Sequence, residues 1–412
     1  MPRKRINIDP PAMGFGHAER THDLSYTISL LTPMVGGGVK SWIPDKIAPV
    51  RSQSVKGLLR FWWRAMQVGD TNSASLRESE NHLWGGTGNA SLVKIVLNCH
   101  NDIKMKTLQR GTTGKVEYDT LPDYVLFPLQ GQTDMNRFDV IQDCSFTLSI
   151  DCPPEYKEDV DICVRLWVLF GGIGARTRRG CGSLYCNEIM DNYQNPGDIS
   201  NFLHHFGDED EAALSTAPYP RLCGASFRHR LVTQTDTIGA WKSFLDRYKH
   251  FRQGVNCGRN PGAGSRPGRT RWPEADAIRR ITGCVAGNHL PVHPANNWFP
   301  RGAYGLPIQT EFKNEPTDPR GKFMLQPETA ERWPSPVILK IIKLGSGQLL
   351  ETCLILNAAM PARLELRDER RSLRTLSANE MPLASAGKAM PVPGPILANE
   401  NPYDGLIRHL GL

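Results

Sequence analysis

The chain has 412 residues, of which 40% are hydrophobic and 22% are charged, the composition of an ordinary globular protein with room for two cores. Lys and Arg outnumber Asp and Glu by 49 to 42, so the net charge of +7 is mild and its distribution matters more than its size. No apolar run approaches the length of a membrane span, and the basic start MPRKRINIDPP has no apolar segment behind it. We therefore expect a cytoplasmic protein without a secretory signal and without membrane contact.

The first half of the chain alternates strands and helices. Strict apolar–polar alternation predicts strands at 24–30 and 144–150, and the segments 92–97 and 182–189 are also predicted to be strands. Apolar stripes of helical period predict helices at 54–68 and 156–170. Ser54 is the expected N-cap of the first helix. Its expected buried stripe is Leu58, Phe61, Trp62 and Ala65. The resulting β-α-β-β-α-β order is that of a ferredoxin-like, split-βαβ domain.

An insertion and a second domain complete the predicted organisation. The 46 residues at 98–143 exceed what a hairpin needs, which is typical of a functional insertion. In the second half we expect strands in GASFRHRLV, LPIQTEF, SPVILKIIKL and QLLETCLIL, and helices at 240–251, 273–283 and 362–373. The predicted fold class is α+β, with two tandem ferredoxin-like domains that carry long insertions. The expected boundaries are 1–200 for the first domain, 215–375 for the second and 376–412 for a tail, with the junction near 195–220.

The segment GGIGARTRRGCGSL, residues 171–184, contains five glycines and three arginines and no acid. It follows a helix and leads into a strand, the reverse of a phosphate-binding nucleotide loop, and it matches neither GxGxxG nor a P-loop. We therefore expect no nucleotide cofactor. Backbone amides and guanidinium groups both suit RNA phosphates. The candidate RNA-binding residues are Gly172, Gly174, Arg176, Arg178, Arg179 and Gly180; the alternative is a surface loop whose arginines pair with acids elsewhere.

Two further basic regions are candidates for the same role. Lys56, Arg60 and Arg64 are four residues apart on the first helix and form a basic stripe, which alone is equally typical of a solvated helix face. Arginines crowd the segment 247–280, where Arg269 and Arg271 flank Trp272. Trp272 either stacks on a base, as aromatic side chains do in single-strand binders, or belongs to the core.

Metal and catalytic signals are weak. Cys257, Cys284, His289 and His293 have spacings at which Cys and His ligands hold Zn²⁺, but no second close pair supports a site, and a loop with surface histidines is the alternative. We assign no metal and no cofactor. His22 is a candidate acid or base for metal-independent RNA cleavage, and Asp45 either takes part in chemistry or caps a turn.

These residues together resemble a known family. The segments TPMVGGG, VKGLLRFWWRAM, HLWGG and GGIGARTRRGCGSL, followed by RTRWPEADAIRRITG, FPRGAYGLPI and SPVILKIIKL, resemble the RAMP superfamily of CRISPR-associated proteins over residues 22–357. Within it, the chain is similar to the large two-domain subunits of type III-B Cmr effector complexes. The resemblance implies two ferredoxin-like domains, guide (CRISPR) RNA and target RNA as ligands, and other Cmr complex subunits as partners. It also implies that the insertion at 98–143 is a thumb-like extension.

The sequence thus predicts a non-catalytic RNA-binding subunit of an antiviral ribonucleoprotein. The resemblance places it near the 3′ end of the guide RNA, where it aids capture of target RNA, and it implies that a different subunit cuts the target, so Asp45 receives no nuclease role. Two alternatives remain open: a metal-independent endonuclease that matures guide RNA through His22, and a scaffold subunit without direct RNA contact.

Overall fold

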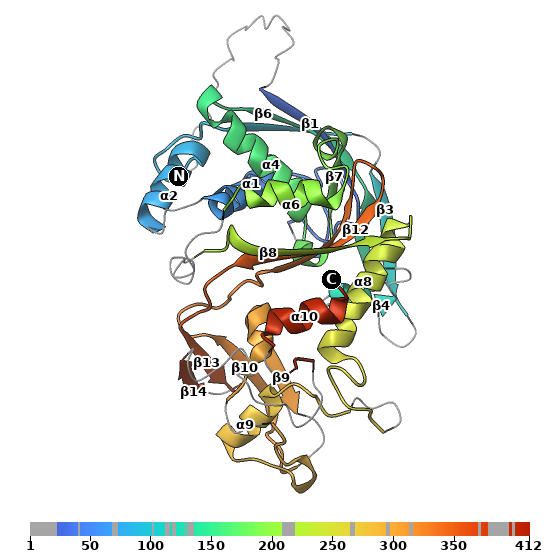
Figure 1. Ribbon diagram of the computed structural model, residues 1–412, viewed down its shortest axis with the longest axis vertical. Helices are drawn as coiled ribbons and strands as arrows, with labels where there is room; N and C mark the ends of the chain where they lie inside the picture. Colours follow the sequence, from blue (N-terminus) through green and yellow to red (C-terminus); the bar gives the residue numbers. More distant parts are fainter. Residues whose placement is uncertain are drawn as a thin grey trace, which may run out of the picture.

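The structure is a computed structural model that describes most of the chain (Figure 1). The described residues are 23–39, 42–67, 73–100, 103–111, 116–117, 121–127, 129, 136–207, 219–263, 268–293, 297–312, 316–369, 372–377, 395–397 and 400–412. His22 lies outside these ranges.

The first sheet is built around β1 (Leu24–Leu30), whose Tyr26 and Ile28 are buried while Ser25 and Thr27 face outward. Its order is β2-β6-β1-β7, and all its pairs are antiparallel. The other strands are β2 (Lys94–Cys99), β6 (Ser145–Asp151) and β7 (Leu184–Cys186). The first three expected strands are confirmed. Of the fourth, 182–189, only Leu184–Cys186 is a strand, because Asn187–Met190 forms a short helix.

Helices α1 (Ser52–Met66) and α4 (Lys157–Phe170) connect these strands, so the predicted β-α-β-β-α-β order is present, with α2 (Ser73–Trp84) as an addition. The expected N-cap was wrong: α1 begins after Arg51, not after Ser54. Its buried stripe is also rotated from the predicted one. The buried residues are Val55, Leu59, Trp62, Trp63, Ala65 and Met66, whereas Leu58 and Phe61 are partly exposed. The stripe rotates because α1 is covered from two sides.

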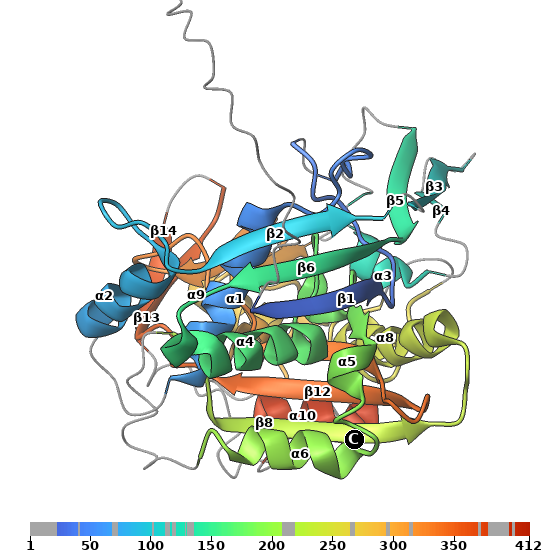
Figure 2. The same ribbon diagram turned by 90° about the horizontal axis from the view of Figure 1, so that it is seen from above.

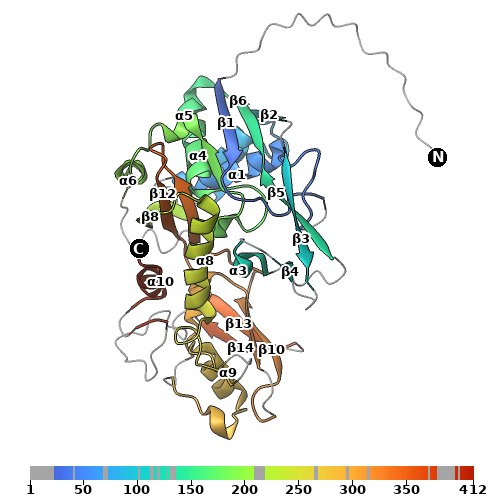
Figure 3. The same ribbon diagram turned by 90° about the vertical axis from the view of Figure 1, so that its right-hand side faces the viewer.

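The insertion at 98–143 forms a small sheet of its own with the order β4-β3-β5 (Figure 3). Its elements are β3 (Lys104–Arg110), β4 (Val116–Glu117), α3 (Asp123–Leu126) and β5 (Arg137–Asp143). Leu108 pairs with Phe138 across the sheet, and both are buried. The α3 end is tied to the second half by an ion pair between Asp123 and Lys249 of 2.8 Å.

The second half contains a three-stranded antiparallel sheet with the order β11-β12-β8. Its strands are β8 (Arg221–Val232), β11 (Val337–Lys343) and β12 (Leu349–Asn357), and α8 (Thr237–Gln253) follows β8. β11 and β12 are buried on both faces, which explains their nearly continuous apolar sequences.

A second antiparallel sheet, β14-β13-β10-β9, lies beyond it at the lower end of the view in Figure 1. Its strands are β9 (Ile308–Phe312), β10 (Gly321–Pro327), β13 (Arg363–Arg367) and β14 (Ser372–Ser377). The helix predicted at 362–373 was wrong, because this segment belongs to the β13–β14 hairpin. Leu364 and Leu366 are both buried, so the alternation that matters here has period two.

Several shorter elements complete the chain. They are α5 (Asn187–Met190), α6 (Pro196–His204), α9 (Glu274–Thr282) and the 3₁₀ turns Pro154–Tyr156, Thr177–Arg179, Gly287–His289 and Pro300–Tyr304. The expected tail at 376–412 ends in a helix, α10 (Pro402–Leu410), and not in a loop. Leu406 and Leu410 of α10 are fully buried in a core shared with α8, so this part of the predicted tail is structural.

The layers stack so that α1 and α4 lie between the two main sheets (Figure 2). Their inner residues share one core with Ile338 and Leu350 of the β11-β12-β8 sheet. The opposite face of that sheet, including Leu339 and Cys353, packs on α8 and α10. The α+β class with antiparallel sheets is thus confirmed.

Candidate nucleic-acid interface

The glycine loop at 171–184 runs against the glycines that follow β1. The amide of Ala175 donates to the carbonyl of Val35 at 2.7 Å, and the amide of Gly182 donates to the carbonyl of Pro33 at 2.9 Å. A side chain on Gly174, which has φ +81°, would place its Cβ 2.6 Å from the Val35 oxygen. Only glycine permits this approach of two backbones. The two glycine loops thus pack directly against each other.

A cavity of about 610 Å³ opens where these loops meet the start of α1. Its lining residues are Met34, Gly36, Gly37, Gly38, Trp42, Pro49, Val50, Arg51, Ser54, Val55, Leu58, Ile173, Gly174, Ala175 and Arg332. None of them is acidic, and the first turn of α1 contains no acid and no side-chain cap. The amides of a helix N-terminus carry partial positive charge and suit anions. The cavity therefore combines two arginines, glycine backbone and a helix N-terminus, which suits a phosphate.

Three lining residues were not predicted from the sequence. Arg51 donates to the carbonyl of Gly37 and so holds the first glycine loop against α1. Arg332 comes from the segment between β10 and β11, is exposed, and has no hydrogen bond or ion pair with the rest of the described chain. Trp42 has the uncommon φ of 66° and offers an aromatic face in the same cavity. The VGGG run close to Trp42 was the sequence feature that could have indicated this cavity.

The predicted stripe on α1 is partly neutralised by α2. Oε1 of the buried Glu80 accepts from Nε of Arg60 at 2.6 Å and from Arg64 at 2.5 Å, so the three side chains carry one net positive charge. Lys56 has no such acid partner within the described residues. It lines a hollow of about 390 Å³ with Gly57, Arg60 and the Gly85–Gly86 turn. Partial burial and the neighbouring Arg60 lower the pKa of Lys56.

The three loop arginines have different surroundings. Arg179 is buried and donates to the carbonyls of Val337 at 2.6 Å and Arg178 at 2.8 Å, so its guanidinium is bound within the protein. Arg176 has φ 63° and donates to the carbonyl of Val125 at 3.1 Å. Arg178 lies over the ring of Phe61, and its buried Nη1 has no protein acceptor among the described residues. Burial and the adjacent Arg179 lower the pKa of Arg178 to about 10. Arg178 is thus the loop arginine least satisfied by the protein.

The remaining loop glycines serve packing. Gly180 has φ +79°, and a Cβ there would lie 2.7 Å from the indole nitrogen of Trp241 in the second half. Gly172 faces the carbonyl of Gly182 within the loop. The loop thus passes between the two halves at 176–182 and lines the cavity only at 173–175.

Among the described residues of the basic region in the second half, Arg269, Arg271 and Trp272 do not form an exposed RNA track. Trp272 is 1% exposed and its indole donates to the carbonyl of Arg252, so no ring face is free for a base. The base-stacking prediction for Trp272 was therefore wrong. Arg269 binds the buried Asp276 at 2.7 Å, and Arg271 donates to the side chain of Asn260 at 2.7 Å. Both arginines stabilise their own loop.

The four residues weighed for zinc do not come together. His293 pairs with Asp276 and His289 with Asp318, each at 2.6 Å. Cys284 is exposed, and Cys257 lies next to His409 instead. The spacing of the histidines in the sequence does not reveal these partners, because each histidine is held by a carboxylate from another element.

Asp45 caps a turn. Its Oδ1 accepts from the amides of Ile47 at 2.9 Å and Ala48 at 3.0 Å, and these hydrogen bonds lower the pKa of the exposed carboxyl. The turn-capping alternative therefore describes it.

Residues 27–185, which include the first sheet and both glycine loops, match the RAMP superfamily, and the resemblance to that superfamily is confirmed. Two curated relatives come from Pyrococcus furiosus. The CRISPR system Cmr subunit Cmr1-2 is 26% identical over 182 residues, 40% of this chain and 94% of that protein. Cmr subunit Cmr1-1 is 30% identical over 140 residues, 33% of this chain and 40% of that protein. Residues 27–185 thus match the RAMP superfamily, and the chain is similar to these two Cmr1 subunits.

Two solved structures also match the chain at low sequence identity. The crystal structure of apo Cmr1 from Pyrococcus furiosus shows 17% identity and a TM-score of 0.46, covering 86% of this chain and 94% of that one. A chain of the type III-B Cmr-beta complex bound to cognate target RNA shows 13% identity and a TM-score of 0.46, covering 81% and 94%. Among the described residues, no helix has the length and apolar character that crossing a membrane requires.

Proposed function

We propose that this chain is a non-catalytic RNA-binding subunit of a type III-B Cmr ribonucleoprotein in the cytoplasm, near the 3′ end of the guide RNA, where it aids capture of target RNA in antiviral defence. Its proposed partners are guide RNA, target RNA and other Cmr subunits. The kinship with Cmr1 subunits supports the assembly. The observation that carries RNA binding is the acid-free cavity between the two glycine loops at the start of α1.

The proposed RNA path continues from this cavity along the exposed side of α1. The cavity and the hollow beside Lys56 are both lined by residues of α1, at its first turn and at its second to third turns. Lys56, Arg51 and Arg332 line this path, and none has an ion pair with an acid in the described chain. Arg178 lies beside the path over the ring of Phe61 on α1, and Trp42 lines the cavity, where we propose that it stacks on a base. Contacts of this kind hold the backbone of RNA, while guide–target pairing supplies the sequence.

We also propose two ferredoxin-like domains, at 1–200 and 215–375, with α10 added to the second. The elements β8, α8, β11, β12 and α10 form a β-α-β-β-α series whose strand order, β11-β12-β8, repeats the β2-β6-β1 order of the first half. This repetition supports a tandem arrangement that lacks the last strand in the second copy.

Gly57 allows a test of the RNA path that does not disturb the fold. It is exposed on α1, and a Cβ there meets no atom within 4 Å. The variants Gly57→Gln and Gly57→Glu both replace glycine with a better helix former and differ from each other only in charge. A phosphate about 4 Å from the added carboxylate is disfavoured by about 1 kcal/mol, roughly fivefold in affinity. We expect Gly57→Gln to keep single-stranded RNA binding and Gly57→Glu to weaken it, less so at high salt.

The binding reactions are run in EDTA and examined on a denaturing gel. Intact RNA with weaker binding by Gly57→Glu supports the proposal. Equal binding by the two variants would remove α1 from the RNA path. RNA cut in EDTA would favour the endonuclease alternative, and no binding at any salt, together with normal assembly into the Cmr complex, would favour the scaffold.

A further inference from the structure

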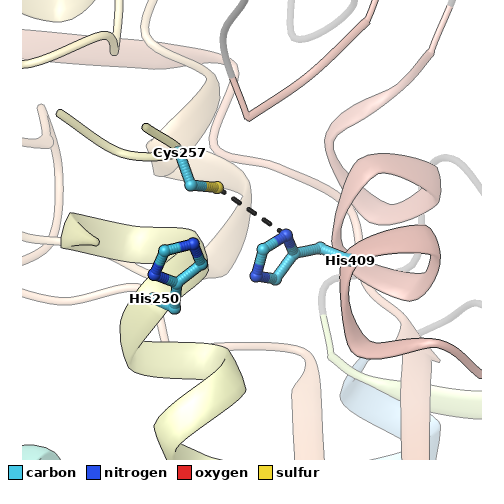
Figure 4. Close-up of side chains that lie close together, drawn as sticks. All are labelled: His250, Cys257 and His409. Atoms are coloured by element: carbon cyan, nitrogen blue, oxygen red, sulfur yellow. Dashed lines mark hydrogen bonds between the residues drawn. The ribbon is translucent and has the colours of Figure 1, made fainter. Parts of the chain in front are cut away.

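Three side chains that the proposed RNA path does not use meet at the junction of α8 and α10. His250 lies in the last turn of α8, Cys257 follows in the loop after that helix, and His409 comes from α10 (Figure 4). Their donor atoms all lie within 4.8 Å of one another. The two imidazole rings face each other with centroids 5.4 Å apart and planes 21° apart.

The distances approach those between ligands of a tetrahedral zinc ion. With Zn–S of about 2.3 Å and Zn–N of about 2.1 Å, sulfur and nitrogen ligands are separated by about 3.6 Å. Sγ of Cys257 lies 3.7 Å from Nδ1 of His409. Two imidazoles on one tetrahedral ion have centroids about 5 Å apart, again near the observed value. A thiol–imidazole hydrogen bond links Cys257 to His409, and His250 stacks on His409, so the three donor groups converge on one point.

We propose that His250, Cys257 and His409 bind one Zn²⁺ ion, which fastens the C-terminal helix α10 to the end of α8. Thiolate and imidazole are the ligands that zinc prefers, and the HisCysHis set supplies three of its four positions. The fourth position opens toward a cavity lined by Gly239, Lys242, Ser243, Asp246, Arg247, His250 and His409. Asp246 lies one helical turn before His250 and therefore on the same face of α8. It is not among the groups whose ligand atoms meet in the cluster, so a water from this cavity completes the shell.

The surroundings favour the neutral form of His409. Burial, with His250 and Arg408 nearby, lowers the pKa of His409, which favours the neutral form that binds metals. Burial raises the pKa of the Cys257 thiol, so binding must displace its proton. Two of the neighbouring cations are already paired: Arg408 with Glu400 at 2.5 Å and Arg247 with Glu351 at 2.5 Å.

The experiment is a Co²⁺ titration of the full chain after removal of metals, under reducing conditions, with the zinc content of the untreated protein measured in parallel. We expect one equivalent of metal, a tetrahedral cobalt spectrum with a thiolate charge-transfer band, and displacement of Co²⁺ by Zn²⁺. Cys257→Ser should lose the charge-transfer band, and His250→Gln should weaken binding by at least about tenfold. Because His250 is exposed, His250→Gln leaves the core unchanged.

Cys284→Ser is the matched control, since Cys284 is an exposed cysteine outside the cluster. It should bind cobalt like the unmodified chain. Zinc should also raise the melting temperature of the unmodified chain more than that of His250→Gln. The proposal is overturned if the unmodified chain shows no thiolate–cobalt band and no bound zinc, or if Cys284→Ser loses the band while Cys257→Ser keeps it.

Discussion

Lys340 provides a quantitative test of the packing between the two halves. It lies on β11, is 1% exposed, and its ammonium donates to the carbonyl of Val168 at 2.9 Å. Val168 belongs to the last turn of α4, where backbone carbonyls lack helical partners. Lys340 thus caps α4 from the neighbouring sheet. Burial lowers the pKa of Lys340 from 10.5 to about 7.

The free-energy cost of this lysine depends on pH. The unfolded state holds the proton up to pH 10.5 and the folded state only up to about pH 7, so stability rises between these values. The linkage gives a cost of about 4 kcal/mol at pH 7, which falls to about 1 kcal/mol at pH 10. Lys340→Met removes this cost but leaves the Val168 carbonyl without its donor, at about 1–3 kcal/mol. We expect the variant to be about 2 kcal/mol more stable at pH 7 and to lose about 3 kcal/mol of that advantage by pH 10.

Urea unfolding at the two pH values, followed by tryptophan fluorescence, measures the difference. Lys343→Met on the same strand controls for removing a cation, because Lys343 lies over Tyr185 and is not fully buried. A stability difference between Lys340→Met and the unmodified chain that is the same at pH 7 and pH 10 would refute the reasoning.

The other predictions concern charges that the structure places within the protein. Arg179→Ala should lower the unfolding free energy by about 3 kcal/mol, because the buried Val337 carbonyl loses a charged donor. The control Arg332→Ala, at an exposed residue, should change the unfolding free energy by no more than about 0.5 kcal/mol. Equal losses of stability in thermal unfolding of the two variants would argue against a structural role of Arg179. Glu80→Gln should release Arg60 and Arg64 toward RNA, lowering stability while making the slope of log affinity against log salt steeper by about 0.7 per added phosphate contact. An unchanged slope would show that these arginines do not reach RNA.

The elements that follow from local pattern were predictable. β1 and β6 alternate strictly, and α4 carries a buried stripe of Val160, Cys163, Trp167 and Phe170 before a glycine pair. Such periodicity depends only on one face being buried. The helix prediction for 362–373 was wrong because the charges of this segment suggested a helix, whereas Leu364 and Leu366 lie on a strand and are buried in the core of a separate sheet. The helix α10 was not predicted, because the Pro-rich sequence before it suggested a tail.

At the candidate site, contacts between residues far apart in the sequence could not be predicted. Glycine-rich segments indicate places where two backbones can approach closely, and the loop after β1 does contact the loop at 171–184. The fate of each charge was not predictable, because it depends on a residue far along the chain. Glu80 neutralises the α1 stripe, Val337 accepts from Arg179, and Arg332 reaches the cavity from the second half. Cys257 likewise meets a histidine 152 residues away.

The loop at 171–184 has two physical tasks, and this decides how its variants can be interpreted. Residues 173–175 line the cavity, while Arg179 and Gly180 contact Val337 and Trp241 across the junction of the halves. Replacing all three loop arginines would therefore weaken the packing of β11 and α8 as well as any RNA contact, and a loss of binding would have two causes. Substitutions at Gly57 and Arg332 change charge at the cavity and its path without touching a buried hydrogen bond. Only such variants separate RNA affinity from the stability of the fold.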